Sequence, residues 1–430
     1  MDRQELAAII DSHNATRAAH LAADLDHTAA VLARSGRSAE TVVSALAEFS
    51  VAAPSWAVGT GGTRFGRFPI GGEPRTTEEK IDDVAVLNAF TAANPTVSLH
   101  VPWDLPDDPE ALRQYATARG IGFDAMNSNT FQDNPSTTDG GRLSYKFGSF
   151  ANADKAVREV AVQHNREVID LGVKLGTEAL TIWLADGTSY PGQANHGTQF
   201  ERVAACLREV HDHLPGGWRM FTEHKPYEPA FYATVNADWG SSLLLAEAAG
   251  PQAACLVDLG HHLPNTNVEQ VVSRLALRGR LGGFHFNDAK YGDDDLTSGS
   301  IRPYQLFLVF CELLLVGGGQ LPRLAYMIDQ SHNLKDPLED LIQSTEAIAC
   351  AYAQALLVDR PALAAAQDDN DPALAQELLQ AAFRTDVRPL TAEARRRSGG
   401  AIEPLRAYRA SAYRRLVLQQ RGAAAVATGL

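Results

Sequence analysis

Short apolar segments rich in β-branched or aromatic residues recur along the chain, and each is followed by a stretch with helical periodicity. Eight such segments can be identified, at 48–56, 97–104, 121–127, 179–185, 219–225, 254–260, 281–287 and 324–330. Between them, Lys155–Leu171 and Gln199–His211 carry apolar residues three and four positions apart, as on a helix with one buried face. A strand followed by a helix, eight times over, predicts an α/β chain folded as a closed parallel (β/α)8 barrel.

An open, doubly wound parallel sheet is the alternative arrangement, because strand and helix alternate there as well. That fold commonly binds a dinucleotide at a GxGxxG turn after its first strand, and no such motif follows the first segment here. The barrel is therefore the preferred fold. The glycine-rich stretch Gly59–Gly66 lacks the GK[ST] ending of a phosphate-binding loop, and we expect a lid or a subunit contact there.

The chain extends beyond the predicted barrel at both ends. We divide it into a helical lead-in at 1–44, the catalytic barrel at 45–336 and a helical extension at 337–430. In the extension we expect a helix over Leu338–Leu357, breaks at Pro361, Pro372 and Pro389, and a solvated helix face at Arg395–Arg397. The extension either wraps around a neighbouring subunit or caps its own barrel on the solvent side.

Charge and composition narrow the range of partners. Acidic residues number 52 against 38 basic ones, a formal net charge of −14, so the surface as a whole repels nucleic acid and anionic lipid. The four cysteines form no CxxC pair, which argues against a disulfide framework and a thiolate zinc site. Charged residues interrupt the N-terminal stretch 1–14, so it does not resemble an export signal. Leu306–Val316 is too short to span a bilayer, and we expect a buried helix there. We expect a cytoplasmic protein without nucleic-acid or membrane partners.

Side chains suited to metal binding follow four consecutive strand segments, where the carboxyl ends of barrel strands converge on one mouth. They are Glu223, Asp258, His285 and Asp329. Their spacing suits successive strand–helix units and excludes a local zinc finger or calcium loop. Three carboxylates at one point repel one another unless a cation lies among them. The mostly oxygen donor set favours Mn, with Co, Mg or Zn as alternatives.

A second group of possible ligands lies beside the first. His261 follows Asp258 by three residues, and an aspartate run at 293–295 comes soon after the seventh strand segment. Asp293 and Asp295 can turn to one side of a loop and, with His261, hold a second cation that shares Asp258 with the first. Such a run is often only an exposed acidic turn, but its position after a ligand-bearing strand favours the metal site.

Further polar and aromatic side chains lie at the same strand ends. Lys225 follows Glu223 by two residues, so its ammonium points to the same mouth and either polarises a substrate oxygen or neutralises the carboxylates. His100 lies close to Asp104 and is either an acid–base group with a near-neutral pKa or a structural histidine. Aromatic rings beside hydrogen-bonding groups are typical of sugar-binding pockets, and the predicted lining is Trp56, Trp103, Phe131 and Trp183.

Five motifs run through the predicted barrel. They are LHVPWD at 99–104, TEHKPYEP at 222–229, VDLGHH at 257–262, HFNDAKYGDDDL at 285–296 and MIDQSHN at 327–333. As a set they resemble the metal-dependent aldose–ketose isomerases with a xylose-isomerase-like TIM barrel, and most closely the bacterial L-rhamnose isomerases. The resemblance covers the barrel, whereas the lead-in and the C-terminal extension carry no motif of their own.

The resemblance implies a reaction and a cofactor set. Two divalent metal ions per subunit are implied, the first on Glu223, Asp258, His285 and Asp329, and the second on His261, Asp293 and Asp295 with Asp258 shared. The implied reaction converts L-rhamnose to L-rhamnulose by hydrogen transfer between C1 and C2, with D-allose and D-psicose as further substrates. The implied catalytic residues are His100, Lys225 and Asp329, of which Lys225 contacts O1 and His100 serves ring opening or holds the ring oxygen.

The resemblance also implies an oligomeric assembly, and several other activities remain as alternatives. Phe65, on the glycine-rich stretch, resembles an aromatic residue lent to a neighbour's pocket, which implies a homotetramer. The D-xylose isomerase pattern fits less well, because His285 stands where that family has an aspartate. Other sugar isomerase specificities, a multi-metal phosphodiesterase on the same barrel and a sugar-binding module without catalysis are the remaining alternatives.

Overall fold

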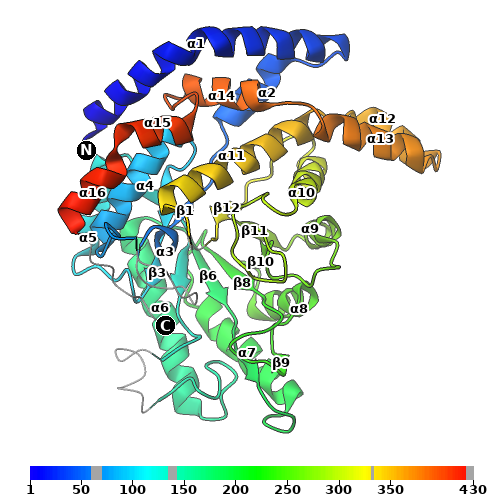
Figure 1. The fold of residues 1–430 in the computed structure, drawn as a ribbon. Helices are drawn as coiled ribbons and strands as arrows, with labels where there is room; N and C mark the ends of the chain where they lie inside the picture. Colours follow the sequence, from blue (N-terminus) through cyan, green and yellow to red (C-terminus); the bar gives the residue numbers. More distant parts are fainter. Residues whose placement is uncertain (60–69, 134–142, 331–333, 423–430) are drawn as a thin grey trace.

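A parallel β-sheet of seven strands forms the centre of the molecule (Figure 1). The computed structural model describes residues 1–59, 70–133, 143–330 and 334–422. Along the sheet the strands follow the order β12-β11-β10-β8-β6-β5-β3. Their bounds are His100–Val101 (β3), Met126–Ser128 (β5), Ala179–Trp183 (β6), Arg219–Glu223 (β8), Ala253–Asp258 (β10), Leu281–Phe286 (β11) and Ala325–Ile328 (β12). The α/β class predicted from the sequence is confirmed.

Three short parallel strands form a second sheet. Their bounds are Ala53–Pro54 for β1, Thr96–Ser98 for β2 and Gly122–Phe123 for β4. β1 pairs with β2, and β2 pairs with β4. Ala52 forms a parallel bridge with Met327 of β12 through backbone hydrogen bonds of 2.8 and 3.0 Å to the residues on either side of Met327. Each of the eight predicted segments therefore contains strand residues, and the first segment lies beside the last.

The strands are buried on both faces, as expected for a parallel sheet covered by helices. All six residues of β10 and all six of β11 are buried. Gly282 of β11 is required by packing, because a Cβ atom at this position would come within 2.6 Å of the Phe221 ring. A separate antiparallel pair, β7 (Gly187–Thr188) and β9 (Ala233–Thr234), joins the loops that follow β6 and β8. The strands thus form rigid supports for the side chains at their carboxyl ends.

Helices follow most of the parallel strands along the chain. Their bounds are Ser55–Val58 (α3), Thr77–Thr91 (α4), Pro109–Ala118 (α5), Lys155–Leu175 (α6), His196–His211 (α7), Trp239–Ala249 (α8), Val268–Leu277 (α9) and Pro303–Val316 (α10). The helices predicted over Lys155–Leu171 and Gln199–His211 are confirmed as α6 and α7. Asp154 and Asn195 begin them, each accepting a hydrogen bond from a backbone N–H of the first turn. The predicted buried helix is α10, of which six residues are buried.

The remaining helices come from the two ends of the chain. They are α1 (Arg3–Arg34) and α2 (Ala39–Ala47), then α11 (Pro337–Leu356), α12 (Arg360–Asp368), α13 (Pro372–Phe383), α14 (Arg388–Arg397), α15 (Pro404–Ser411) and α16 (Tyr413–Arg421). Figure 1 shows α14 beside α1 and α2, and these helices are in contact. The helix predicted over Leu338–Leu357 is confirmed as α11. Pro361, Pro372 and Pro389 lie in the first turns of α12, α13 and α14, where proline begins a helix without losing a hydrogen bond.

The prediction that Arg395–Arg397 form a solvated helix face is wrong for Arg395. Its side chain is 7% exposed, and its guanidinium pairs with Glu346 of α11, with Nη2 at 3.1 Å from Oε2. Arg396 and Arg397 instead pair with Glu393 of the same helix, at 2.8 Å. Successive residues of a helix point about 100° apart, so one of three adjacent arginines can face a neighbouring helix while the others stay near solvent.

Membrane spans were also expected to be absent. Within the part of the chain that the structure describes, no single helix has both the length and the apolar character needed to cross a membrane. The bent pair formed by α11 and α12 passes that test only when its two helices are taken together.

Candidate metal centre

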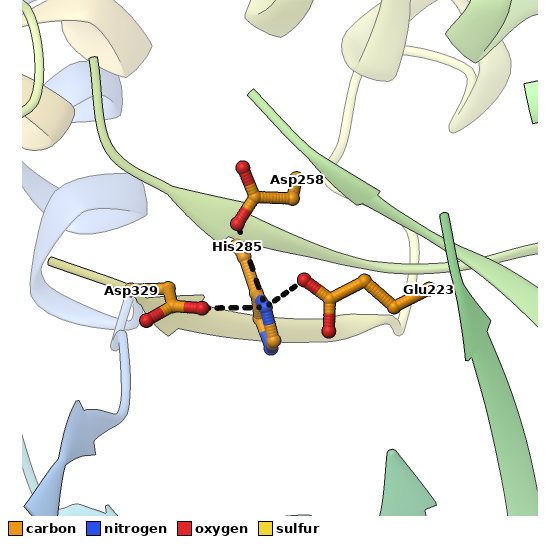
Figure 2. Close-up of side chains that lie close together, drawn as sticks. All are labelled: Glu223, Asp258, His285 and Asp329. Atoms are coloured by element: carbon orange, nitrogen blue, oxygen red, sulfur yellow. Dashed lines mark hydrogen bonds and ion pairs between the residues drawn. The ribbon is translucent and has the colours of Figure 1, made fainter. Parts of the chain in front are cut away.

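Four side chains from neighbouring strands meet at the carboxyl edge of the sheet. Glu223 ends β8, Asp258 ends β10, His285 lies near the end of β11, and Asp329 directly follows β12. Each offers a ligand atom, and these atoms all lie within 4.8 Å of one another. Figure 2 shows the three carboxylates directed at one edge of the imidazole. From His285 Nδ1 the distances are 3.1 Å to Glu223 Oε1, 3.2 Å to Asp329 Oδ2 and 3.7 Å to Asp258 Oδ2.

Burial gives this cluster unusual proton affinities. Burial raises the pKa of Asp258 to about 7, with Glu223 and Asp329 adding to the effect and His261 opposing it. Burial alone lowers the pKa of an imidazole, but the carboxylates of Glu223 and Asp329 outweigh it and raise the pKa of His285 well above its ordinary value. Burial acts to raise the pKa of Asp329, but the hydrogen bond from His285 and a contribution from Trp56 hold it below its ordinary range. Three carboxylates and one imidazole form a donor set that fits a divalent cation such as Mn²⁺.

Two neighbours orient the carboxylates. The indole Nε1 of Trp56 donates to Asp329 Oδ1 at 2.8 Å, so this predicted pocket residue also holds a possible ligand. Asn287 Nδ2 donates to both oxygens of Asp258, at 3.0 and 3.1 Å. Sequence analysis missed Asn287, although the two-residue period of a strand places it on the same face as His285. Partners of this kind fix the direction of a metal ligand and tune its affinity.

The second predicted group lies directly beside the first. His261 Nε2 is 2.9 Å from Asp293 Oδ1, and His261 Nδ1 is 3.3 Å from Glu223 Oε1. Both His261 and Asp293 are buried, at 6% and 3% exposure. Burial lowers the pKa of an imidazole, but Asp258 and Asp293 more than offset it and raise the pKa of His261 to about 9. Glu223 Oε1 thus lies near both imidazoles, at 3.1 Å from His285 Nδ1 and 3.3 Å from His261 Nδ1.

Asp258 and Asp295 are the remaining members of the predicted second group. Asp258 Oδ1 accepts the backbone N–H groups of Gly260 and His261, at 2.7 and 3.2 Å. This turn directs the carboxylate between the two histidines. Asp295 lies in the same loop as Asp293 and is half-buried. The alternative of an exposed acidic turn therefore does not apply to Asp293, which is buried against His261.

Lys225 enters the same group from β8. Its Nζ pairs with Asp293 and, at 2.9 Å, with Glu228 Oε2. It also lies 4.6 Å from the ring centre of Trp183, a cation–π distance. The structure thus places this ammonium between the acidic loop and Trp183, whereas the sequence predicted only that it points to the same mouth as Glu223.

The predicted aromatic lining forms a continuous row. Ring centres are 5.3 Å apart for Trp56 and His100, 4.7 Å for His100 and Trp103, 6.0 Å for Trp103 and Phe131, and 4.5 Å for Phe131 and Trp183. Trp56, at one end of the row, contacts Asp329, and Trp183, at the other end, contacts Lys225. Phe65 lies outside the described residues. An apolar wall therefore faces the charged cluster along one side.

His100 differs from its prediction. Burial lowers its pKa to about 4, so the expected near-neutral pKa is wrong. Asp104 accepts the backbone N–H of His100 at 2.8 Å and does not hold the ring. The other oxygen of Asp104 forms a buried ion pair with Lys80 Nζ at 2.6 Å. Sequence analysis missed Lys80, because nothing in its helical segment distinguishes a buried lysine from a solvated one.

Comparisons with known proteins point in one direction. No protein-family model matches the chain. The chain is 51% identical to a probable sugar isomerase of Rhizobium meliloti (strain 1021), over 97% of both chains. It is likewise 51% identical to a probable sugar isomerase of Mesorhizobium japonicum, over 98% of both chains. A xylose isomerase from Thermus thermophilus is 27% identical over 62% of this chain and 70% of its own.

Solved structures share the fold. An L-ribulose 3-epimerase superposes with a TM-score of 0.52 at 16% identity, covering 71% of this chain and 95% of that one. A 3-keto-D-glucoside 4-epimerase from E. coli gives a TM-score of 0.50 at 12% identity, covering 69% of this chain and 98% of that one. At these identities the likeness establishes the arrangement of strands and helices.

Proposed function

The chain belongs to the family of the two rhizobial sugar isomerases, and on this basis we propose that it is a metal-dependent aldose–ketose isomerase acting on L-rhamnose. The product is L-rhamnulose, and D-allose and D-psicose are further substrates. The observation that carries the proposal is the meeting of Glu223, Asp258, His285 and Asp329 within 4.8 Å, beside a row of aromatic rings. A polyol chain can place its hydroxyls toward the charged cluster and its C–H faces against the rings.

Two divalent ions, Mn²⁺ in the first instance, are proposed as cofactors. The first is assigned to the four strand-end ligands, and the second to His261, Asp293 and Asp295 with Asp258 shared. When bound, such ions stabilise negative charge that develops on substrate oxygens during hydrogen transfer between C1 and C2. The buried, mutually repelling carboxylates support this assignment, since they need compensating positive charge.

The protein's own residues bind and orient the sugar. Lys225 is proposed to contact O1, where its ammonium favours negative charge on that oxygen. Because burial lowers its pKa to about 4, His100 is neutral near pH 7. It is proposed to accept a hydrogen bond from a sugar hydroxyl during ring opening, which a charged imidazolium cannot do. Trp56, Trp103, Phe131 and Trp183 exclude water on the apolar side.

The architecture is proposed to be one closed (β/α)8 barrel. The bridge between Ala52 and Met327 supports closure, since it links the first strand segment to the last. We propose that the chain consists of three units, which are the lead-in at 1–44, the barrel at 45–336 and the extension at 337–430. The extension and Phe65 are proposed to make contacts between subunits in a homotetramer, in the cytoplasm.

A panel of aldoses tests the proposed activity. The protein is stripped with EDTA, reloaded with Mn²⁺ and incubated with L-rhamnose, L-mannose, L-lyxose, D-allose or D-xylose, and the ketose formed is measured. The highest kcat/KM is expected for L-rhamnose. A preference for D-xylose would favour the second candidate, which the 27% identity to a xylose isomerase supports. Absence of any ketose, with nicking of abasic DNA instead, would show a phosphodiesterase.

The affinity of the site for Mn²⁺ is expected to fall as the pH is lowered. Asp258, with its pKa raised to about 7, and His285, with its pKa raised well above the ordinary value, both hold protons at low pH. A metal ion must displace these protons, so Mn²⁺ binding should weaken by at least about tenfold between about pH 7 and about pH 6. Calorimetry in two buffers of different ionisation enthalpy measures the protons released. An affinity that does not change with pH would contradict the assignment of these ligands.

A further inference from the structure

We infer that Asp294 is a positioning residue that holds Asp293 and Asp295 toward the second cation site. The inference rests on the proposed function, because that site is part of the proposal. The sequence places Asp294 in the middle of the acidic run but gives it no role. Its carboxylate contacts the backbone of its own loop, whereas that of Asp293 contacts His261, and this difference in partners suggests its role.

Asp294 binds the backbone of its own loop. Its Oδ2 accepts the N–H groups of Lys290 and Tyr291, at 2.5 and 2.8 Å, and its Oδ1 accepts the N–H of Gly292 at 3.3 Å. A carboxylate that accepts several backbone N–H groups fixes the turn that supplies them. The carboxylate of Asp294 thus contacts the loop backbone, whereas Asp293 Oδ1 lies 2.9 Å from His261 Nε2.

The backbone on either side of Asp294 adopts a conformation that side chains disfavour. Asp293 has φ of +50° and Asp295 has φ of +48°, both in the left-handed region. Residues other than glycine stay there only when surrounding contacts hold them. The three hydrogen bonds to the Asp294 carboxylate supply part of these contacts, and the contacts of Asp293 with Gly260 and His261 supply another part. The hydrogen bonds of the Asp294 carboxylate let consecutive aspartates point to different sides of the loop. Such an arrangement is required if Asp293 and Asp295 bind the second cation and Asp294 does not.

The base of the loop is fixed independently of Asp294. Asp288 and Leu296 exchange two backbone hydrogen bonds of 2.9 Å. The Asp288 carboxylate also accepts the N–H groups of Ile301 and Arg302, at 2.7 and 2.8 Å. Closer to the tip, the amide of Asp293 donates to the carbonyl of Gly260 at 2.8 Å. Loss of the Asp294 carboxylate should therefore release the turn at 290–292 that leads into Asp293 and Asp295, while the base of the loop, the strands and the four-residue cluster keep their structure.

The test compares Asp294→Ala with Asp294→Asn by titrating metal-free protein with Mn²⁺, using calorimetry and electron paramagnetic resonance. In Asp294→Ala, one Mn²⁺ should bind as in the native protein, and the other should bind about 10- to 100-fold more weakly. Asp294→Asn keeps an acceptor oxygen and should recover most of the affinity. Asp371→Ala is the matched control, because Asp371 also accepts a backbone N–H but begins the remote helix α13.

The outcomes separate this inference from the proposed function. Native protein that binds two Mn²⁺ ions, with unchanged affinities in Asp294→Ala, overturns the role of Asp294 alone. Native protein that binds a single ion overturns the proposed second site and this inference with it. The positioning role is established if Asp294→Ala selectively loses one ion, Asp294→Asn recovers that ion and Asp371→Ala binds both ions like the native protein.

Discussion

Replacing Glu223 with glutamine is expected to reduce kcat on L-rhamnose by about 10³-fold, the largest effect of any single substitution in the cluster. Glu223 Oε1 lies 3.1 Å from His285 Nδ1 and 3.3 Å from His261 Nδ1, so its charge acts on both proposed cation sites. Glutamine keeps the shape of the side chain but removes that charge. Steady-state kinetics at several Mn²⁺ concentrations measure the loss.

Two controls show whether the effect of Glu223→Gln is on the site and not on the fold. The free energy of unfolding, measured with urea in the presence of EDTA, should change by no more than about 3 kcal/mol, the range for a hydrogen bond to a charged group. The matched variant Glu209→Gln changes an exposed carboxylate on α7 and should turn over like the native protein. A Glu223→Gln variant with native kcat would contradict the assignment of Glu223 to the metal centre.

The second large effect is expected for Lys225→Met, with kcat lowered by about 10²- to 10³-fold and KM changed less. The Lys225 side chain is 2% exposed, and its ammonium lies between Asp293, Glu228 and the ring of Trp183. Methionine keeps the apolar stem and removes the charge that is proposed to stabilise negative charge on O1. Such a charge acts in the transition state, so its loss should appear in kcat.

Saturating Mn²⁺ distinguishes the two roles considered for Lys225. If the ammonium only neutralised the carboxylates, excess metal should restore native kcat in Lys225→Met. We expect kcat to stay low when both ions are bound. The exposed variant Lys155→Met, on α6, should keep native kinetics. Native turnover of Lys225→Met at saturating Mn²⁺ would contradict a role in the reaction.

The main elements and the meeting of four strand-end side chains could be predicted from the sequence because they follow simple periodicities. A two-residue period and a strand end suffice to bring Glu223 and Asp258 to one edge of a parallel sheet. The apolar spacing of α6 likewise marks one helix face. Such features depend on local sequence, and the rest of the fold then brings the strand ends together.

Other features depended on packing between distant segments, which the sequence does not display. Burial within the aromatic row lowers the pKa of His100 to about 4, whereas its sequence context alone predicted a near-neutral value. Arg395 faces Glu346 of α11, and Lys80 reaches Asp104 from α4, although each residue type is usually solvated. Nor did the sequence show that Asp294 turns back onto its own loop. In each case a partner far away or a turn conformation decided the outcome.

Anomalous diffraction from crystals of the Mn²⁺-loaded protein tests whether the four strand-end side chains bind a metal ion. We expect a manganese peak coordinated by Glu223, Asp258, His285 and Asp329, with metal–oxygen distances of about 2.0–2.6 Å, the range for divalent cations with oxygen ligands. A protein that isomerises L-rhamnose, yet whose anomalous map has no peak among these four side chains, would contradict the proposed metal centre.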